Sequence, residues 1–189
     1  MRRDLMARVM SANPDLTIAL AGNPNAGKTT VFNRLTGSRQ HTGNWPGKTI
    51  ERKSGRYKHA GTLVEVVDLP GTYSLTAYSE EEIVARDFLL EGDADLVVVV
   101  VDASNLERNL YLAVQILEMQ IPVLIALNMS DMAESLGVEI DVDILSKGLG
   151  DIPVIRMAAA RGEGIDALKE AILLHMNQSP TERSLDPIV

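Results

Sequence analysis

The chain has 189 residues, 46% of them hydrophobic and 23% charged, which suits one globular domain with a proper core. Its net charge of −8 provides no overall positive field for a polyanion, so nucleic acid is not an expected partner. The absence of cysteine excludes disulfides and thiolate metal sites and suits a reducing compartment such as the cytoplasm. The longest apolar run, residues 96–101, is far shorter than the roughly 20 residues that span a bilayer as a helix.

Apolar runs and turn signals predict the elements along the chain. Strands are expected at 16–21, 50–57, 62–67, 95–102, 122–128 and 153–157, and helices at 30–35, 80–90, 105–120, 142–148 and 165–177. Residues 38–48 and 68–79 lack periodicity and are expected to be loops. This alternation predicts an α/β fold: a six-stranded, mostly parallel sheet with one antiparallel edge strand and helices on both faces.

The strongest motif lies between the first strand and the first helix. It fits the P-loop pattern G-x-x-x-x-G-K-[ST] and reads Gly22, Asn23, Pro24, Asn25, Ala26, Gly27, Lys28 and Thr29, with Thr30 next in the helix. Backbone N–H groups and the helix N-terminus are expected to hold phosphates, Lys28 to reach the β- and γ-phosphates, and the Thr29 hydroxyl to ligate Mg²⁺. A plain glycine turn would not explain a lysine beside a hydroxyl residue.

A second motif, at the end of the third predicted strand, comprises Asp68, Leu69, Pro70 and Gly71. Here a carboxylate can hold the magnesium shell through water, and a glycine N–H can meet the γ-phosphate. Such turns are common, so the motif gains its weight from following the P-loop lysine after an intervening hairpin.

A third motif, Asn128, Met129, Ser130 and Asp131, follows the fifth predicted strand and fits the N-x-x-D arrangement that reads guanine. Adenine would leave the carboxylate unpaired, at a cost of roughly 2–5 kcal/mol, so GTP and GDP are favoured over adenine nucleotides. The alternative is an Asx turn that caps the next helix.

A fourth segment follows the last predicted strand, where domains of this kind use Ser-Ala-Lys beside the base. Here the sequence has Ala159, Ala160 and Arg161. The Ala160 N–H can still donate to the guanine oxygen, but the serine that would brace the loop is missing. We therefore expect weaker base contacts, and slower nucleotide release in an Ala159→Ser variant.

With these motifs in order, the chain resembles a translation-factor-type small G protein, and two loops sharpen the resemblance. Residues 40–55 and 73–82 resemble the first and second switches of the FeoB-type bacterial ferrous iron transporters, and Met129 and the P-loop sequence also fit; the resemblance covers residues 16–175. It implies that Gly47, Lys48 and Thr49 close over the nucleotide, with Thr49 joining Thr29 and Asp68 around Mg²⁺.

The resemblance also implies partners and a location. In that family a helical domain and a membrane channel follow this region in the same polypeptide, so the chain is expected to be the cytoplasmic part of a protein of the bacterial inner membrane. Residues 1–15 are expected to be an extension, 16–177 the G domain, and 178–189 a linker or truncated tail. Homo-oligomerisation is left open.

One position bears on hydrolysis. Thr72 stands where many small GTPases carry a water-positioning glutamine, and Lys48, Arg52 and Lys53 are read as a solvated face and not as an arginine finger. GTP hydrolysis is therefore expected to be slow, on the order of 10⁻⁴ to 10⁻² per second. By the family resemblance, Asn25 helps bind K⁺ beside the phosphates, and the expected catalytic set is Lys28, Asn25, Thr49 and Gly71; the alternative for Asn25 is a turn residue.

Other conspicuous residues have plainer interpretations. The three histidines are scattered without metal-ligand spacing, Trp45 either docks a partner or anchors its loop over the nucleotide, and Glu80 to Glu82 suit a helix start better than iron binding. Two functional alternatives stay open: an Era/MnmE-type G domain in ribosome or tRNA maturation, and a nucleotide sensor with incidental turnover.

Overall fold

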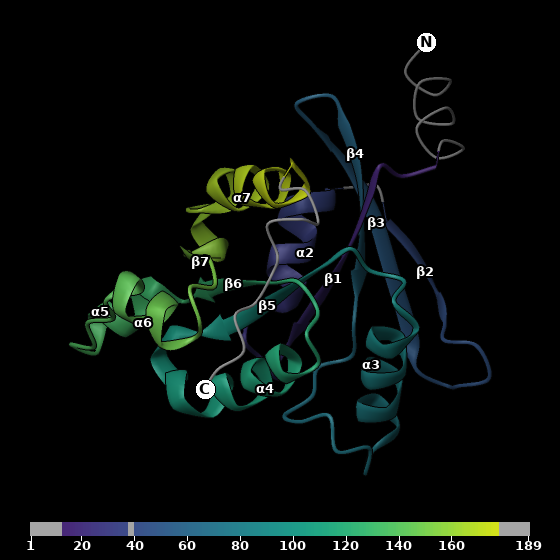
Figure 1. Ribbon diagram of the computed structural model, residues 1–189, viewed down its shortest axis with the longest axis horizontal. Coiled ribbons are helices and arrows are strands. Elements are labelled where there is room, and N and C mark those ends of the chain that lie inside the picture. Colours follow the sequence, from purple (N-terminus) through teal and green to yellow (C-terminus); the bar gives the residue numbers. More distant parts are fainter. Residues whose placement is uncertain (1–12, 38–39, 178–189) are drawn as a thin grey trace.

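The computed structural model describes residues 13–37 and 40–177 and centres on a seven-stranded sheet of order β2-β3-β4-β1-β5-β6-β7 (Figure 1). Neighbouring strands from β4 to β7 pair in parallel, whereas β2 and β3, and β3 and β4, pair antiparallel. The strands are β1 (Leu16–Gly22), β2 (Gln40–Asn44), β3 (Glu51–His59), β4 (Thr62–Asp68), β5 (Leu96–Asp102), β6 (Val123–Asn128) and β7 (Val154–Arg156). The expected tail at 178–189 and most of the expected extension, residues 1–12, lie outside the described residues.

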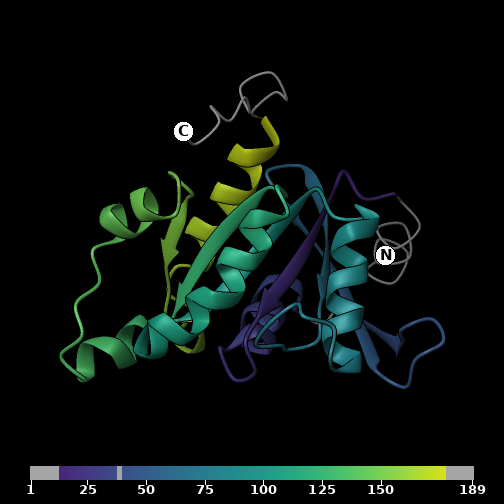
Figure 2. The same ribbon diagram turned by 60° about the horizontal axis from the view of Figure 1, so that its bottom comes forward.

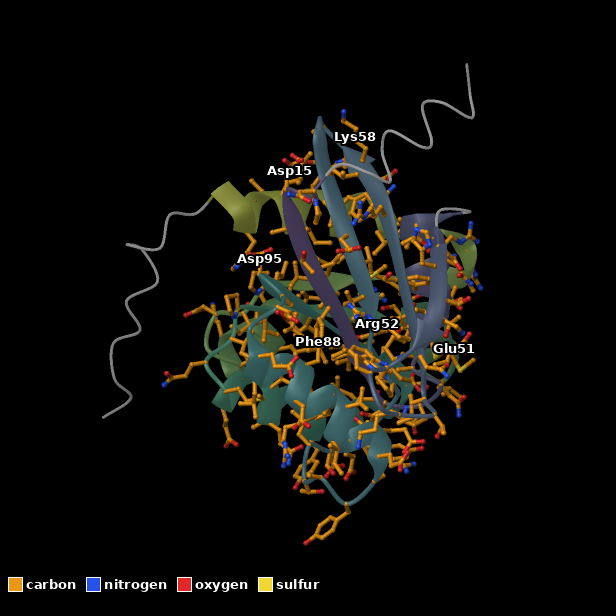
Figure 3. The ribbon with its side chains drawn as sticks, turned by 90° about the vertical axis from the view of Figure 1, so that its right-hand side faces the viewer. Asp15, Glu51, Arg52, Lys58, Phe88 and Asp95 are labelled. Atoms are coloured by element: carbon orange, nitrogen blue, oxygen red, sulfur yellow. The ribbon has the colours of Figure 1, made fainter. Side chains whose placement is uncertain are left out.

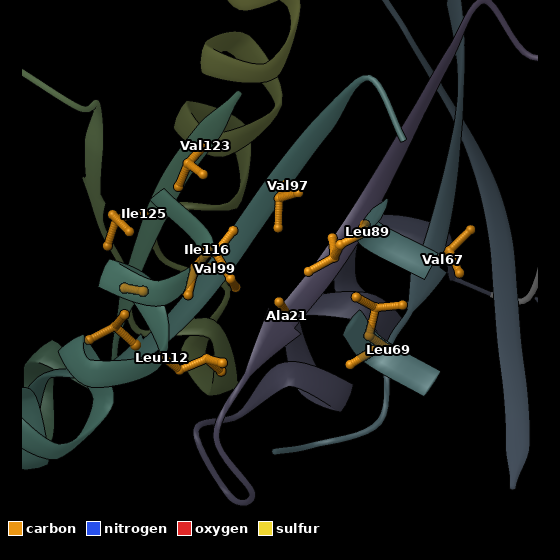
Figure 4. Packing of buried hydrophobic residues seen from close by; sticks show 14 of the residues in the cluster. Ala21, Val67, Leu69, Leu89, Val97, Val99, Leu112, Ile116, Val123 and Ile125 are labelled. Carbon is orange, nitrogen blue, oxygen red and sulfur yellow. The ribbon is translucent and has the colours of Figure 1, made fainter. Parts of the chain in front are cut away.

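Helices cover both faces of the sheet. They are α2 (Lys28–Thr36), α3 (Glu80–Glu91), α4 (Leu106–Glu118), α5 (Ser130–Ser135), α6 (Val142–Gly148) and α7 (Ile165–Asn177), with short 3₁₀ turns η1 (Ala103–Asn105) and η2 (Ala159–Arg161). Helices α3 and α4 lie on one face of the sheet (Figure 2). Side chains of β5 alternate between two cores: Val97 and Val99 belong to the cluster with α3 and α4 (Figure 4), and Val98 and Val100 belong to the cluster with α2 and α7. Burial on both faces explains the valine run.

The predicted fold class is confirmed, but the sheet has one strand more than the six expected. The additional strand is β2, which lies in the segment 38–48 that was expected to be a loop. It pairs antiparallel with β3 from Gln40 opposite Gly55 to Asn44 opposite Glu51, so β2 is the edge strand and β3 lies inside. Four of its five residues are exposed, and a strand without a buried face leaves no hydrophobic alternation in the sequence.

Two shorter features also differ from the expected boundaries. The four residues between the expected strands 50–57 and 62–67 include only a two-residue turn, Ala60 and Gly61. Their φ angles of 46° and 92° both lie in the left-handed region, as a two-residue hairpin turn requires. The helix α5 was not predicted as a separate element. It is only 6 residues long, too short for a clear helical period.

The topology brings the four motifs to one rim of the sheet. The P-loop follows the carboxyl end of β1, the Asp68 motif follows β4, the Asn128 motif follows β6, and η2 follows β7. Because β1, β4, β5, β6 and β7 are parallel, their carboxyl ends gather on the same side. Residues more than a hundred positions apart in the chain can therefore form one site.

Candidate functional site: a nucleotide-binding rim

The P-loop connects β1 to α2 through two glycines that accept no side chain. Gly22 has a φ of 156°, and a Cβ there would lie 2.6 Å from the carbonyl oxygen of Val100 on β5. Gly27 has a φ of 88°, and its Cβ would lie 2.2 Å from Nδ2 of Asn128. Both distances are too short for any Cβ, so the loop can pass this close to its neighbours only with glycine at both positions.

Asn23 fixes the start of the loop. It is buried, its backbone oxygen accepts from the Ala26 N–H at 3.2 Å, and its Nδ2 donates to the backbone oxygen of Arg108 on α4 at 3.3 Å. Asn25, at the tip, is exposed and has a φ of 67°, a conformation that asparagine tolerates better than most residues. The side chain predicted to meet K⁺ therefore lies on the open side of the loop.

An ion pair connects the first and second motifs. The Lys28 Nζ lies 2.9 Å from Asp68 Oδ1, with the two side chains 11% and 7% exposed. Lys28 is in the first turn of α2 and Asp68 ends β4, where its backbone pairs with that of Leu20. Thr29 follows on the same helical turn and is exposed, and Thr30 is half-buried.

The second motif packs against the end of β1 and the P-loop. The Leu69 N–H donates to the Leu20 oxygen at 3.0 Å, and the Thr72 N–H donates to the Gly22 oxygen at 3.3 Å. A Cβ on Gly71 would lie 3.3 Å from the backbone of Pro24, so the two loops are in close contact there. Pro70 is half-buried between these anchor points.

The residue after Gly71 is packed inward. Thr72 is 4% exposed, whereas Tyr73 is 44% exposed. The Arg108 guanidinium lies over the Tyr73 ring in a cation–π contact, 4.2 Å from the ring centroid. A buried threonine in this position has no side chain directed to solvent with which to hold an attacking water. The slow hydrolysis expected from the absence of glutamine stays a prediction.

The first switch is anchored through Trp45. This side chain is buried and meets Phe88 of α3 edge-to-face at a centroid separation of 5.4 Å. The Arg52 guanidinium lies 4.9 Å from the centroid of its ring. Figure 3 labels Phe88 and Arg52, the two residues that Trp45 contacts. The backbone of Trp45 also closes the loop, since it donates to Ile50 and accepts from Lys48. Trp45 thus anchors its loop against α3, whereas the two expected roles, docking a partner and anchoring the loop over the nucleotide, stay predictions.

Thr49 lies in the turn between Trp45 and Ile50. It is exposed, as is Gly47, and within the described residues no hydrogen bond connects Thr49 to Thr29 or Asp68. Gly47 has a φ of 68°, which allows the tight turn between Trp45 and Ile50. The first switch meets the second motif through β3, where Lys53 lies opposite Asp68.

Asn128 links three of the motifs. It is 3% exposed; its Nδ2 donates to the Ala26 oxygen at 3.0 Å, and its Oδ1 accepts from the Ala159 N–H at 3.0 Å. This side chain therefore joins the P-loop to the loop after β7, and both of its polar atoms are satisfied.

Asp131 of the third motif and Arg161 of the fourth pair beside a small cavity. Asp131 Oδ2 lies 3.0 Å from Arg161 Nε, and both residues line a cavity of about 190 Å³. Met129 has a φ of 58° and makes the turn that places Asp131 on the first turn of α5. Ala160 is exposed, and its N–H donates no hydrogen bond within the part of the chain that the structure describes. The Asp131 carboxylate lines this cavity, and the Ala160 N–H makes no hydrogen bond within the described residues.

The contact of Arg34 with the loop after β7 was not predicted from the sequence. Arg34, from α2, donates from Nε to the Ala159 oxygen at 3.1 Å and from Nη2 to the Ala160 oxygen. No spacing rule connects residues 125 and 126 positions apart, so only the packing of α2 beside η2 could show it.

The family model for Ferrous iron transport protein B matches residues 16–172. The chain belongs to the FeoB family. The resemblance inferred from the switches is thereby confirmed, and the match favours a FeoB G domain over the Era/MnmE-type alternative.

Relatives of known sequence and structure agree. The Fe(2+) transporter FeoB of Salmonella typhimurium is 57% identical over 164 residues, which are 85% of this chain and 21% of that protein. The cytosolic domain of T. maritima FeoB in its GMPPNP form is 47% identical with a TM-score of 0.84, covering 87% of this chain and 65% of the other. The isolated T. maritima G domain has a TM-score of 0.81 at 47% identity, covering 86% and 99%.

The chain therefore spans about a fifth of the length of the full FeoB relatives. Among its described helices, none is both long enough and apolar enough to cross a membrane. The described residues also contain no group of three or more histidines and carboxylates arranged to hold a metal ion.

Proposed function

We propose that this FeoB G domain binds GTP and GDP, hydrolyses GTP slowly, and acts as the cytosolic regulator of a membrane ferrous iron transporter. The observation that carries the proposal is the bridging of the phosphate loop and the guanine loop by Asn128. A nucleotide needs its phosphates and its base held at a fixed separation, and this side chain sets that separation. The solved T. maritima relative in a GMPPNP form supports the nucleotide class.

Guanine selectivity follows from the charges beside the cavity. The Asp131 carboxylate can accept from N1 and N2 of guanine, and the Ala160 N–H can donate to O6. Adenine presents the opposite donor pattern at N1 and position 6, so it would make neither hydrogen bond, at a cost of roughly 2–5 kcal/mol. Arg161, paired with Asp131, keeps that carboxylate oriented along the cavity.

The phosphate end has the donor chemistry that Mg²⁺ prefers. The Thr29 hydroxyl and the Asp68 carboxylate are hard oxygen donors at the ends of adjacent elements, and Thr49 would add a third oxygen once the first switch closes. Bound Mg²⁺ would neutralise charge that develops on the phosphate oxygens. Lys28 contributes a fixed cation in the same place and holds Asp68 until the nucleotide is present.

Slow turnover is proposed because the chain's own residues do not position water. Thr72 is buried and the adjacent Tyr73 is engaged by Arg108, so the loop presents no amide or carboxylate at this point. We therefore place the unassisted rate on the order of 10⁻⁴ to 10⁻² per second. The side-chain oxygen of the exposed Asn25 is suited to K⁺, which would supply a positive charge beside the phosphates.

Single-turnover GTP hydrolysis in matched KCl and NaCl tests this assignment. We expect at least about a tenfold faster rate in K⁺, reduced to the Na⁺ rate in Asn25→Ala. Equal rates in both salts would remove the cation-assisted mechanism while leaving GTP binding intact. A rate that no cation or partner changes would favour a nucleotide sensor, and failure to bind mant-GTP would overturn the proposal as a whole.

The proposed partners are in the same polypeptide. Because the full relatives are about five times longer than the matched region, we propose that a helical domain and a membrane channel follow this domain in the bacterial inner membrane. The genomic sequence beyond Val189 tests this directly. Apolar segments of roughly 20 residues there are expected, and an open reading frame that stops without them would exclude the transporter role.

A further inference from the structure

Arg34 holds the guanine loop from the side of α2. Arg34 lies in the last turn of α2, and its guanidinium donates to two consecutive carbonyl oxygens, those of Ala159 and Ala160. A Cβ added to Gly162 would lie 3.6 Å from the same guanidinium, so the loop passes close to it there as well. A planar guanidinium can serve two such acceptors at once because its N–H groups diverge in a fixed fork.

The first of these hydrogen bonds acts on the peptide unit that matters for base recognition. The oxygen of Ala159 and the N–H of Ala160 belong to the same planar, trans peptide, so they point in opposite directions. An oxygen held by Arg34 Nε therefore directs the Ala160 N–H away from Arg34 and leaves it free to donate. A charged donor on the oxygen also polarises the peptide and makes its N–H a stronger donor.

The preceding peptide is held from another side. Its N–H, that of Ala159, donates to Asn128 Oδ1 at 3.0 Å. The two successive peptide units of this loop are thus fixed by side chains from two different elements, β6 and α2. Within the described residues, Asn128 and Arg34 are the side chains that hydrogen-bond to the backbone of Ala159 and Ala160.

We propose that Arg34 is a positioning residue for guanine recognition, which orients the Ala160 N–H toward the base oxygen O6; this rests on the guanine-nucleotide binding proposed above. Alanine at position 159 removes the serine hydroxyl that was expected to brace this loop. Arg34 supplies a brace from α2 in its place. Because Arg34 holds the Ala160 N–H toward O6, the contact with the base is stronger than Ala159 alone would allow.

The test compares GDP with 6-thio-GDP, in which sulfur, a poor hydrogen-bond acceptor, replaces O6 while N1–H and the 2-amino group remain. Affinities are measured by competition against mant-GDP. We expect Arg34→Met to reduce the preference for GDP over 6-thio-GDP by about three- to tenfold, because the Ala160 N–H is no longer held toward O6. Arg34→Lys should give an intermediate loss, since one ammonium cannot serve both carbonyls with the same geometry.

Arg86→Met is the matched control. Arg86 is on α3 and pairs with the exposed Asp87, so this variant removes the same charge without touching the loop. It should keep the wild-type preference. If R34M keeps it too, or weakens both nucleotides equally, Arg34 does not position the N–H and the inference is overturned.

Two further results separate this inference from the function on which it rests. A wild-type chain that binds neither mant-GDP nor GDP overturns both together. A wild-type chain that binds GDP but does not prefer it to 6-thio-GDP overturns the role of Ala160 and Arg34 alone. If R34M does not fold, R34K provides the test instead. A wild-type preference of R34K for GDP over 6-thio-GDP would then overturn the proposal.

Discussion

The Lys28 ammonium lies 2.9 Å from the Asp68 carboxylate, and this ion pair links the start of α2 to the end of β4. Both side chains are largely buried, so removal of one partner leaves a charge with little solvent around it. We expect Lys28→Met to lower the free energy of unfolding by roughly 1–3 kcal/mol and to abolish measurable mant-GTP binding. Chemical denaturation and fluorescence titration measure the two effects.

The double variant Lys28→Met with Asp68→Asn provides the control for that prediction. It removes both charges, so stability should recover by at least half of the loss while nucleotide binding stays absent. Lys53→Met, which breaks a more exposed pair with Glu51, should change stability by less than about 0.5 kcal/mol. Equal stability of K28M and the wild type would show that the pair does not matter to the fold.

Gly27 is expected to tolerate no side chain. In Gly27→Ala the new methyl would lie 2.2 Å from Asn128 Nδ2 at a φ of 88°. We expect a loss of about 1–3 kcal/mol in stability and at least a tenfold loss in mant-GDP affinity, because Asn128 must move from Ala26 and Ala159. Gly43→Ala is the control: nothing lies within 4 Å of its Cβ position, and it should bind as the wild type does. Wild-type affinity in G27A would contradict the described contact.

Trp45 should report on the first switch. It is the single tryptophan of the chain, and its buried ring contacts Phe88. We expect Trp45→Ala to cost about 2–4 kcal/mol of stability and Trp45→Phe about 1 kcal/mol, since a phenyl ring keeps part of the contact. Tyr78→Ala, which removes an aromatic side chain 93% exposed, should cost little.

The fluorescence of Trp45 also reports on its packing. In the folded protein the tryptophan emission should lie at shorter wavelength than in denaturant, and it should shift when GDP is exchanged for a GTP analogue. A folded-state emission equal to that of the unfolded chain would mean that Trp45 is not packed on α3 in solution.

Glu82 couples the second switch to α3 and makes stability depend on pH. Its carboxylate accepts from the Ser74 hydroxyl at 2.7 Å and from the Tyr78 N–H at 2.9 Å, and it completes a capping box with Ser79. The Ser74 hydrogen bond, followed by that from Tyr78, lowers the pKa of Glu82 below its ordinary value of 4.5. The folded state therefore favours the ionised form.

The sign of the effect follows from that direction. A lowered pKa contributes stability that is fully present above pH 4.5 and is lost as the pH falls through the folded-state pKa. We expect Glu82→Gln to melt at a lower temperature than the wild type at pH 7, with the difference shrinking below pH 4.5. Glu81→Gln removes a charge from the same helical turn and should show a smaller difference. A gap between E82Q and the wild type that is independent of pH would exclude this linkage.

Local patterns sufficed for most of the fold and for three parts of the site. The P-loop, Asp68 and the Asn128 motif follow strands whose hydrophobic runs are unambiguous, and parallel topology then requires them to meet at one rim. The strand β2 could not be predicted, because it has no buried face and is held by backbone hydrogen bonds to β3. The contact of Trp45 with α3 could not be predicted, because no residue in the segment around Trp45 shows which helix it packs against.

By itself the sequence determined the family and the order of the helices and strands other than β2 and α5, because these depend on residue types at short, fixed spacings. Only the tertiary structure decided which side chains join the loops: Asn128 between Ala26 and Ala159, Trp45 on Phe88, and Arg34 on the carbonyls of Ala159 and Ala160. These partners are far apart in the chain. Their meeting depends on how helices pack on the sheet, which is a property of the whole core and not of any local pattern.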